Sequence, residues 1–301
     1  MNRPLLGIAL KLGATLAFTL MYAVIKLAGD VPLGETIFFR SVFAMVPLFI
    51  LAGYTGGIRQ MVRTHRPFVH LTRSMVGVCA MFLNFAALQT LPLADITAFS
   101  FVMPIFAVLL AVLLLKEQVG MYRSAAVLIG FAGVLLMIEP YGGIRAIVAA
   151  GPSSGAGLAL AAAFMSAFVV VFIRQMSATE NSQTIVFYFM LFSGMAGAIS
   201  LIGDFVMPTV LMATWLVLAG LFGGIGQVCM TYSYRFAQPS LLAPFDYVAM
   251  VWATGLGFAI FGDVPQTLVL AGAGVVIAAG LFIVWRERQL KKKALPLPAS
   301  V

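Results

Sequence analysis

Charged residues are scarce in this sequence: they make up 9% of the 301 residues, whereas 62% are hydrophobic. A soluble globular domain carries roughly 25% charge, and a mean hydropathy of +1.07 over the whole chain is too high for a single buried core. These figures exclude a soluble enzyme, a nucleic-acid-binding module and a disordered chain. They indicate that lipid surrounds most of the chain.

Cysteine and histidine are scarce as well, with two of each. Cys79 and Cys229 lie inside apolar segments, as small core hydrophobes do, and they suit neither a disulfide framework nor a metal site. His65 and His70 lie in a short basic segment, where we expect both to be solvated. We therefore expect no metal and no cofactor.

Motifs of ATP-driven pumps and of enzymes are also missing. The chain contains no Gly-x-x-x-x-Gly-Lys-[Ser/Thr] phosphate loop, so we expect that ATP does not drive it directly. It contains no His-Glu-x-x-His and no Gly-x-Ser-x-Gly motif, and no histidine falls at mid-membrane. An intramembrane enzyme is therefore only a remote alternative.

Ten long apolar runs dominate what is present. A membrane-spanning helix needs about 20 apolar residues, and runs such as 106–115 lack the alternation of a barrel strand. The runs cover residues 5–28, 34–53, 69–89, 94–115, 121–139, 155–176, 184–203, 211–233, 239–261 and 265–285. We predict an all-α integral membrane protein with ten transmembrane helices.

Lysine and arginine predict the orientation, because they gather on the cytoplasmic side. With the N-terminus inside, the outer loops hold only Arg145. The inner ends and loops then hold Arg3, Arg59, Arg63, Arg66, Arg73, Lys116, Arg123, Arg174, Arg235, Arg286, Arg288 and Lys291 to Lys293. We expect both termini in the cytoplasm, with 286–301 as a basic tail that contacts anionic lipid.

The two halves of the chain resemble each other at a nearly constant offset. Residues 36–39 match 184–187, Pro92 matches Pro239, and Glu117 matches Asp263. Because each half has an odd number of helices, the second must be inverted in the membrane. We predict a first five-helix repeat over 1–148 and an inverted second over 149–285, an arrangement found in secondary transporters and not needed by a receptor.

Polar side chains within the first span share one helical face, at Lys11, Thr15, Thr19, Tyr22 and Lys26. Such a stripe is costly in lipid and should face the bundle interior or a wet cavity. The alternative is hydrogen bonding between helices, with the two lysines reaching opposite interfaces.

Span nine carries Asp246, the acid that we predict to lie deepest, and Pro244 should disturb the helix beside it. Asp246 either accepts a substrate ammonium or carries a proton, or it makes a structural hydrogen bond near the inner surface. Arg40 either pairs with Glu35 or clamps a carboxylate. The predicted cavity-lining residues are Thr15, Thr19, Tyr22, Asn84, Thr97, Ser100, Met103, Gln227, Thr231, Tyr234, Asp246 and Met250.

These residues resemble the drug/metabolite transporter superfamily, EamA type, over essentially the whole chain. The resemblance is carried by the ten-helix plan and by four motifs. They are Phe39-Arg40-Ser-Val-Phe-Ala44, Pro104 with Leu115-Lys-Glu117, Ala243-Pro-Phe-Asp-Tyr247 to Trp252, and Phe261-Gly-Asp-Val-Pro265. Asp263 stands where a glutamate is more usual. The resemblance implies transport across the bacterial inner membrane, with spans 1, 3, 4, 6, 8 and 9 around the substrate.

Within this superfamily the chain looks most like bacterial exporters of amino acids, of the aromatic amino-acid branch. We therefore expect a monomeric secondary transporter that exports small metabolites, above all amino acids, by alternating access. An uptake carrier for S-adenosylmethionine, or for another metabolite such as riboflavin, is the alternative. The expected partners are a small-molecule substrate and the lipid bilayer, without nucleic acid.

Overall fold

The computed structural model describes residues 4–55, 57–64, 66–115, 121–151, 154–176, 179–237 and 239–294, and these residues are helical with no strand among them. The first half holds α1 (Pro4–Leu27), α2 (Leu33–Thr55), α3 (Ile58–Val62), α4 (Pro67–Thr90), α5 (Leu93–Ser100), α6 (Met103–Leu115), α7 (Met121–Ile138), η1 (Glu139–Tyr141) and α8 (Gly143–Ala150). The second holds α9 (Gly155–Met176), α10 (Ser182–Asp204), α11 (Val210–Phe236), α12 (Pro239–Leu242), η3 (Ala243–Tyr247), α13 (Val248–Leu256), η4 (Gly257–Phe261) and α14 (Thr267–Ala294).

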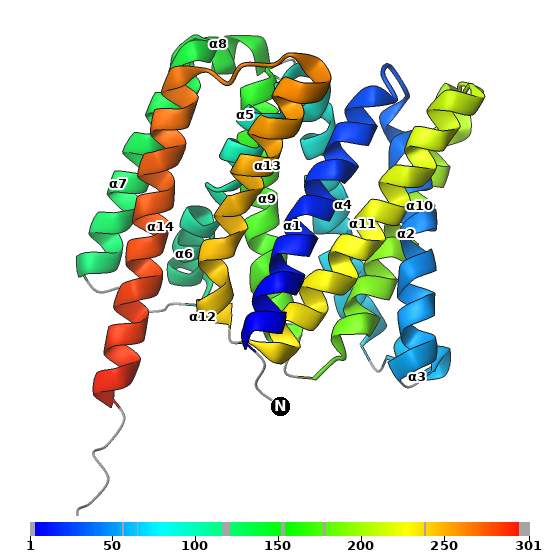
Figure 1. Ribbon diagram of the computed structural model, residues 1–301, viewed down its shortest axis with the longest axis horizontal. Coiled ribbons are helices and arrows are strands. Elements are labelled where there is room, and N and C mark those ends of the chain that lie inside the picture. The colour runs from blue at the N-terminus through cyan, green and yellow to red at the C-terminus, as the bar shows by residue number, and fades with distance from the viewer. Residues whose placement is uncertain are drawn as a thin grey trace, which may run out of the picture.

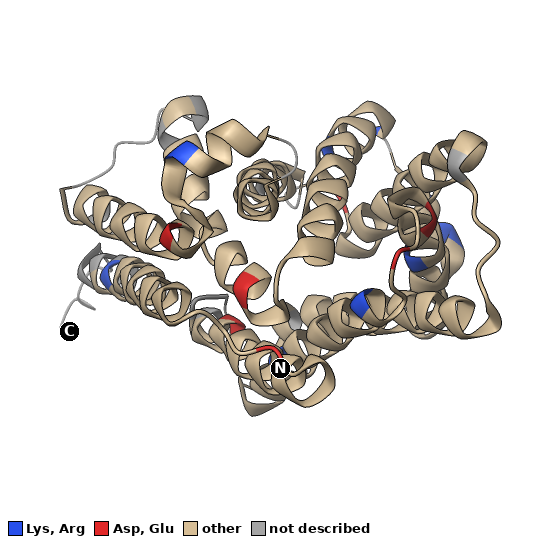
Figure 2. Cartoon of the chain, turned by 90° about the horizontal axis from the view of Figure 1, so that it is seen from above, with Lys and Arg blue, Asp and Glu red and all other residues tan. Residues whose placement is uncertain are grey.

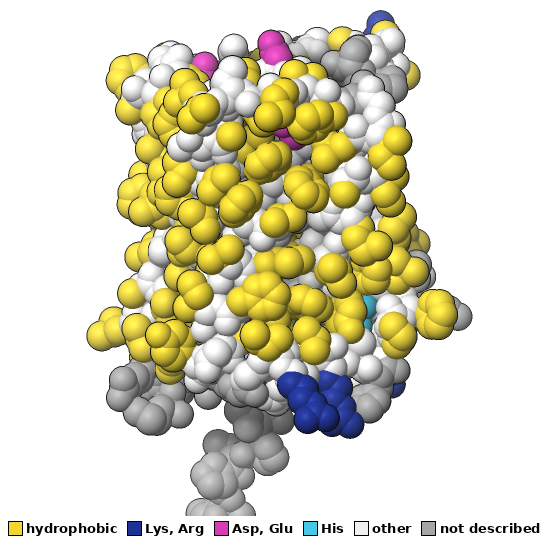
Figure 3. Space-filling model, turned by 90° about the vertical axis from the view of Figure 1, so that its right-hand side faces the viewer, with side chains coloured by type: hydrophobic (Ala, Val, Ile, Leu, Met, Phe, Trp, Pro, Cys, Tyr) yellow, Lys and Arg dark blue, Asp and Glu magenta, His cyan; other side chains and the backbone are white. Residues whose placement is uncertain are grey.

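Ten helical segments within these ranges are long and apolar enough to cross a membrane. Each coincides with one of the ten predicted apolar runs to within a few residues, so the all-α membrane fold is confirmed. Hydrophobic side chains cover the face shown in Figure 3 over most of its height, while lysine and arginine gather mainly at its lower edge. A surface of this kind suits lipid along the sides and water at the ends.

The spans stand side by side as an oblong bundle (Figures 1 and 2). The pair α7 and α14 forms one extreme of the oblong and the pair α2 and α10 forms the other. We call the end where α1 begins and α14 ends the terminal end, and the other the α8 end (Figure 1).

Packing between the spans follows a regular scheme. Helix α1 packs along α11, as α9 packs along α4, and α2 contacts α11 as α10 contacts α4. Helix α6 lies against α9, and α13 lies against α1. Each of these contacts thus has a counterpart when the two halves are exchanged.

Two spans are broken at prolines. In span four a turn at Phe101 and Val102 separates α5 from α6, just before Pro104, which lacks an N–H and crowds the preceding turn. In span nine Pro244 lies in the 3-10 segment η3, which confirms the predicted disturbance, and η4 ends that span as a π-helix. Such irregular turns often accompany functional sites, because they free backbone groups.

Close backbone contact holds α7 against α14. A Cβ at Gly272 would lie 2.6 Å from Met137 Cγ and would collide with the carbonyl oxygen of Gly133, whereas a Cβ at Gly274 would meet nothing within 4 Å. Alanine normally stabilises a helix interior by about 1 kcal/mol relative to glycine. Overpacking costs about 1–3 kcal/mol. At Gly272 the collision should therefore outweigh the gain in helix stability, whereas at Gly274 no collision opposes it.

We therefore expect Gly272→Ala to lower the unfolding temperature of the detergent-solubilised protein by several degrees. Gly274→Ala, its matched control two residues away, should leave that temperature unchanged or raise it. Equal effects of the two variants would contradict a backbone contact between α7 and α14.

Candidate functional site

An ion pair joins α1 to span nine near the terminal end. Lys11 Nζ lies 2.6 Å from Asp246 Oδ1 and donates a hydrogen bond to Tyr234 Oη at 3.1 Å. The Lys11 side chain is 1% exposed, whereas that of Asp246 is 47% exposed. Lys11 is thus buried within the bundle and does not reach for an interface. We call this contact the terminal-end ion pair.

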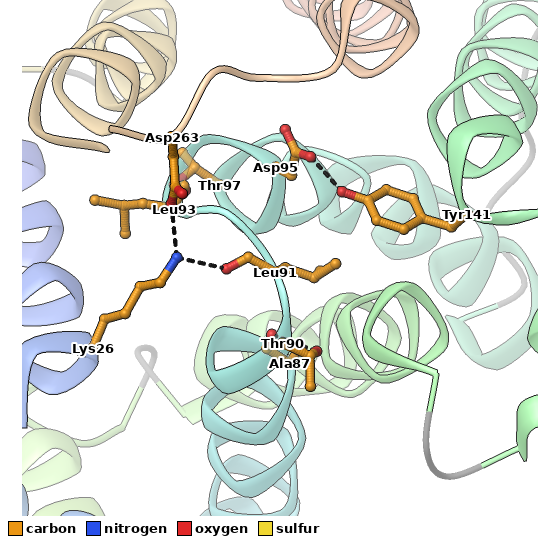
Figure 4. Close-up of polar contacts among 9 residues, drawn as sticks. All are labelled: Lys26, Ala87, Thr90, Leu91, Leu93, Asp95, Thr97, Tyr141 and Asp263. Atoms are coloured by element: carbon orange, nitrogen blue, oxygen red, sulfur yellow. Dashed lines mark hydrogen bonds and ion pairs between the residues drawn. The ribbon is translucent and has the colours of Figure 1, made fainter. Parts of the chain in front are cut away.

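A second ion pair joins α1 to the loop that follows span nine at the α8 end, as Figure 4 shows. Lys26 Nζ lies 2.8 Å from Asp263 Oδ2 and donates a hydrogen bond to the carbonyl oxygen of Leu91 at 3.2 Å. Gly262, with a φ of 68°, takes a left-handed turn after η4 and so places Asp263 where the chain reverses. We call this contact the α8-end ion pair. Helix α1 is therefore bound near the beginning of span nine and just after its end.

Asp95 lies close to the α8-end ion pair, in the first turn of α5 (Figure 4). Tyr141 Oη donates a short hydrogen bond to Asp95 Oδ2, and Asp95 Oδ1 is buried without a partner. Asp95 is 0% exposed. Asp95 is therefore more buried than Asp246, because Pro92 and the start of α5 carry Asp95 into the bundle, while the depth of Asp246 in the membrane stays a prediction. An acid inside the apolar run 94–115 was the sequence signal for it.

A cavity of about 180 Å³ lies between α1, α2 and α4, and its lining includes Lys26, Thr36 and Phe85. Pockets that hold a drug-sized molecule measure about 300–1,000 Å³. This cavity is thus too small for a molecule of that size.

The predicted cavity-lining residues are only partly brought together. Tyr234 and Asp246 meet at Lys11, and Met103 and Met250 pack against the main hydrophobic core. Tyr22 makes an edge contact with Phe85, with ring centroids 6.3 Å apart.

The remaining predicted residues are mostly bonded within their own helices. The hydroxyls of Thr15, Thr19, Thr97, Ser100 and Thr231 each donate to a carbonyl oxygen three or four residues earlier. This local bonding satisfies their protons inside the membrane. Asn84 Oδ1 is buried without a hydrogen-bond partner. The backbone carbonyl oxygen of Gln227 accepts the hydrogen bond from Thr231.

The predicted pair of Glu35 and Arg40 is not formed in this structure. The two residues are five apart in α2, a spacing that points their side chains in different directions. Arg40 Nη1 instead donates to Met190 Sδ at 3.3 Å. Sequence reasoning found Arg40 but counted Arg73 among the inner ends and loops, although Arg73 is buried in α4.

The expectation of a solvated His70 is also wrong. His70 is 0% exposed within α4, its Nε2 lies 3.4 Å from Glu180 Oε2, and its ring packs against that of Tyr188. The predicted run 69–89 already contains His70, and the packing of α4 against α10 is what buries its side chain. His65, Lys116 and Glu117 lie outside the described residues.

Comparisons with known proteins agree with this architecture. The EamA-like transporter family matches residues 5–139 and 153–285. A solved structure aligns with a TM-score of 0.63 at 19% identity, over 95% of this chain and 98% of its own, which shows a shared fold.

The relatives are bacterial transporters named for small molecules. The pseudopaline exporter CntI of Pseudomonas aeruginosa is 28% identical over 91% of this chain and 94% of its own. A riboflavin transporter of Vibrio cholerae is 28% identical over 97% of each chain. An S-adenosylmethionine uptake transporter of Rickettsia bellii is 24% identical over 87% of each.

These matches cover nearly the whole chain, and they point to transport rather than to enzymatic chemistry. With ten candidate spans, the protein is a multi-pass protein of the bacterial inner membrane. The chain belongs to the EamA-like transporter family.

Proposed function

We propose that this small-molecule transporter is a secondary carrier that works by alternating access. The observation that carries the proposal is the pair of Lys–Asp contacts that α1 makes with span nine and with the loop after it, one toward each end of the bundle. Separation of α1 from span nine at either end requires one ion pair to break while the other can hold. A central site could in this way be uncovered on the two sides of the membrane in turn.

The proposed architecture is an inverted repeat of residues 1–148 and 149–285, followed by the cytoplasmic tail 286–301. Two separate family matches, over 5–139 and 153–285, support this division. The exchangeable packing of α1 on α11 and α9 on α4 supports it further. In this proposal both termini are cytoplasmic, because the sequence places almost all lysine and arginine at that end.

The proposed cargo is a small amphipathic metabolite, with amino acids first, and the proposed direction is export. Uptake of S-adenosylmethionine or riboflavin is the second candidate, and the names of two relatives favour it. The proposed lining combines Tyr22, Met103 and Met250 with Asn84 and Gln227, because Met and aromatic surfaces adapt to varied side chains. The carrier would act as a monomer and without ATP.

A counterflow assay with the purified protein in liposomes tests this function. Labelled amino acids, S-adenosylmethionine and riboflavin are offered to vesicles preloaded with the same unlabelled compound. We expect at least one amino acid to accumulate well above protein-free vesicles. If none of the compounds accumulates in vesicles that contain folded protein, the proposed cargo is wrong.

Proton coupling can be tested with the same liposomes. If Asp246 carries the coupled proton, a pH gradient should drive uptake by the parent protein, and Asp246→Asn should abolish that response while counterflow continues. The measurement is uptake with and without the gradient for both proteins. Unchanged pH dependence in Asp246→Asn would remove Asp246 from this role.

A further inference from the structure

Two buried arginines share one aromatic ring where α2, α4 and α10 pack together. The Arg73 Cζ lies 4.2 Å from the centroid of the Phe189 ring, and the Arg40 Cζ lies 5.9 Å from the same centroid. Arg40 is 4% exposed and Arg73 is 6% exposed. The helices α2, α4 and α10 therefore bring two guanidinium groups together out of contact with water.

Neither arginine forms an ion pair with an acid among the described residues. Glu180 accepts a hydrogen bond from Thr64 Oγ1 at 3.1 Å and lies against His70. Asp246 and Asp263 are held by lysines, as described above. The pair of guanidinium groups thus leaves two positive charges uncompensated by the part of the chain that the structure describes.

The contacts that these arginines do make are too weak to explain their burial. A cation–π contact contributes about 0.5–2 kcal/mol, whereas burying an unpaired ion costs several kcal/mol. The Nε atoms of Arg40 and Arg73 and the Nη1 of Arg73 are buried without a hydrogen-bond acceptor. These donors are therefore available for a ligand that supplies negative charge and oxygen atoms.

Buried hydroxyls on the same helices show the same lack of partners. The Oγ atoms of Ser41, Ser74 and Ser193 and the Oγ1 of Thr184 are buried without a hydrogen-bond partner. All four lie on the three helices that carry the arginines and Phe189. Most of the buried side-chain atoms without partners in the described chain lie on α2, α4 and α10. Unsatisfied polar groups are otherwise rare in protein interiors.

Glycines let the helices pack closely around both guanidinium groups. A Cβ built at Gly223 of α11 would lie 2.9 Å from Met21 Sδ and 3.4 Å from Arg40 Nε. A Cβ built at Gly77 of α4 would lie 2.8 Å from a ring carbon of Phe189 and 3.5 Å from Arg73 Nη1. Phe189 and Met190 supply an apolar, adaptable neighbouring surface.

We propose that Arg40 and Arg73 form a binding site for the carboxylate of the transported molecule, with the hydroxyls of α2, α4 and α10 completing its hydrogen bonds. This inference rests on the proposed transport function and deepens it, since it makes a negatively charged head group a requirement for recognition. The planar guanidinium fork matches the two oxygens of a carboxylate, and a phosphate oxyanion would use the same donors. An anionic lipid is the other source of such a group.

Chemical labelling tests this site independently of transport. Phenylglyoxal, which modifies arginine, is applied to the protein in liposomes, and modified peptides are quantified by mass spectrometry. Exposed Arg59 of α3 serves as the reference. We expect Arg40 and Arg73 to react more slowly than Arg59, and L-phenylalanine or L-methionine to slow them at least ten-fold further. The corresponding carboxamides should not protect either arginine.

Other results of the labelling would overturn the proposal. No reaction at Arg40 and Arg73 in the absence of added acid, in a preparation that carries out counterflow, would mean dry structural arginines. Equal protection by acid and amide would exclude recognition of the carboxylate. Protection in phosphatidylglycerol vesicles but not in phosphatidylcholine vesicles, regardless of added acid, would assign the site to lipid. Protection by the acids without any counterflow would uphold the anion site and contradict the proposed transport function.

Substitutions at Arg40 supply a second readout. A hydrogen bond to a charged group contributes about 1.5–3 kcal/mol, so Arg40→Gln should raise the KM for the acid about 10- to 150-fold. Arg40→Lys keeps the positive charge but lacks the planar guanidinium fork, so its KM should lie between those of the parent protein and Arg40→Gln. Unchanged KM in Arg40→Met, with a folded and more thermostable protein, would contradict the site, because an apolar residue often replaces a purely structural buried charge without loss.

Discussion

Cross-linking position 26 to position 263 is expected to stop transport completely. Lys26→Cys and Asp263→Cys are introduced together, with Cys79 and Cys229 changed to serine, and the new thiols are joined by a short bis-methanethiosulfonate. The linker replaces an ion pair, whose N–O distance is 2.8 Å, by covalent bonds. Because alternating access requires α1 and span nine to separate at the α8 end, counterflow should fall to the level of protein-free vesicles.

Reduction of the linker provides the control. The same double-cysteine protein should transport before cross-linking, and its counterflow should return after treatment with a thiol reductant. A protein that transports equally well with the linker in place, as verified by mass spectrometry, would show that the α8-end ion pair does not open during the cycle. The proposed use of the two ion pairs as alternating contacts would then be wrong.

The fold was largely predictable because its main determinant is local. Ten runs of apolar residues decide where helices cross lipid, and each corresponds to a candidate span in the structure. Pro244 was read correctly as a disturbance of span nine, since the loss of an N–H acts on the same turn of the chain. His70 was expected to be solvated in a basic segment, but α4 packs its side chain against α10, a contact that the local sequence does not encode.

The polar contacts were not predictable, because they join positions far apart in the chain. Lys11 and Asp246 were both recognised as intramembrane charges, but nothing in their local sequence pairs them across 235 positions. The same holds for Lys26 with Asp263 and for Arg40 with Arg73. Helical periodicity assigns a residue to a face of its own helix, while packing of the halves decides which face it meets.

The predicted pair of Glu35 and Arg40 illustrates this limit. Both residues lie in the same helix, and their closeness in sequence suggested an ion pair. The five-residue spacing separates their side chains around α2. Arg40 instead approaches α10, where it contacts Met190 and Phe189. Arg40, which the sequence suggested would pair within α2, therefore lies at the interface of the three helices α2, α4 and α10.

The terminal-end ion pair is expected to respond very unequally to loss of its two members. Lys11 is 1% exposed and Asp246 is 47% exposed, so removal of the carboxylate strands a buried ammonium, whereas removal of the ammonium leaves a solvated acid. Breaking a buried pair from one side costs about 3–5 kcal/mol. Asp246→Asn should therefore lower the unfolding temperature in detergent strongly, and Lys11→Met, which fills a similar volume without charge, should change it little.

A double variant separates this charge effect from lost packing. If the cost in Asp246→Asn comes from the unpaired Lys11 ammonium, then adding Lys11→Met should restore most of the lost unfolding temperature. A double variant as unstable as Asp246→Asn alone would instead point to Asp246 contacts other than the ion pair. A larger loss of unfolding temperature in Lys11→Met than in Asp246→Asn would contradict the difference in burial between the two side chains. It would also contradict the interpretation that Asp246 is accessible to solvent while Lys11 is shielded from it.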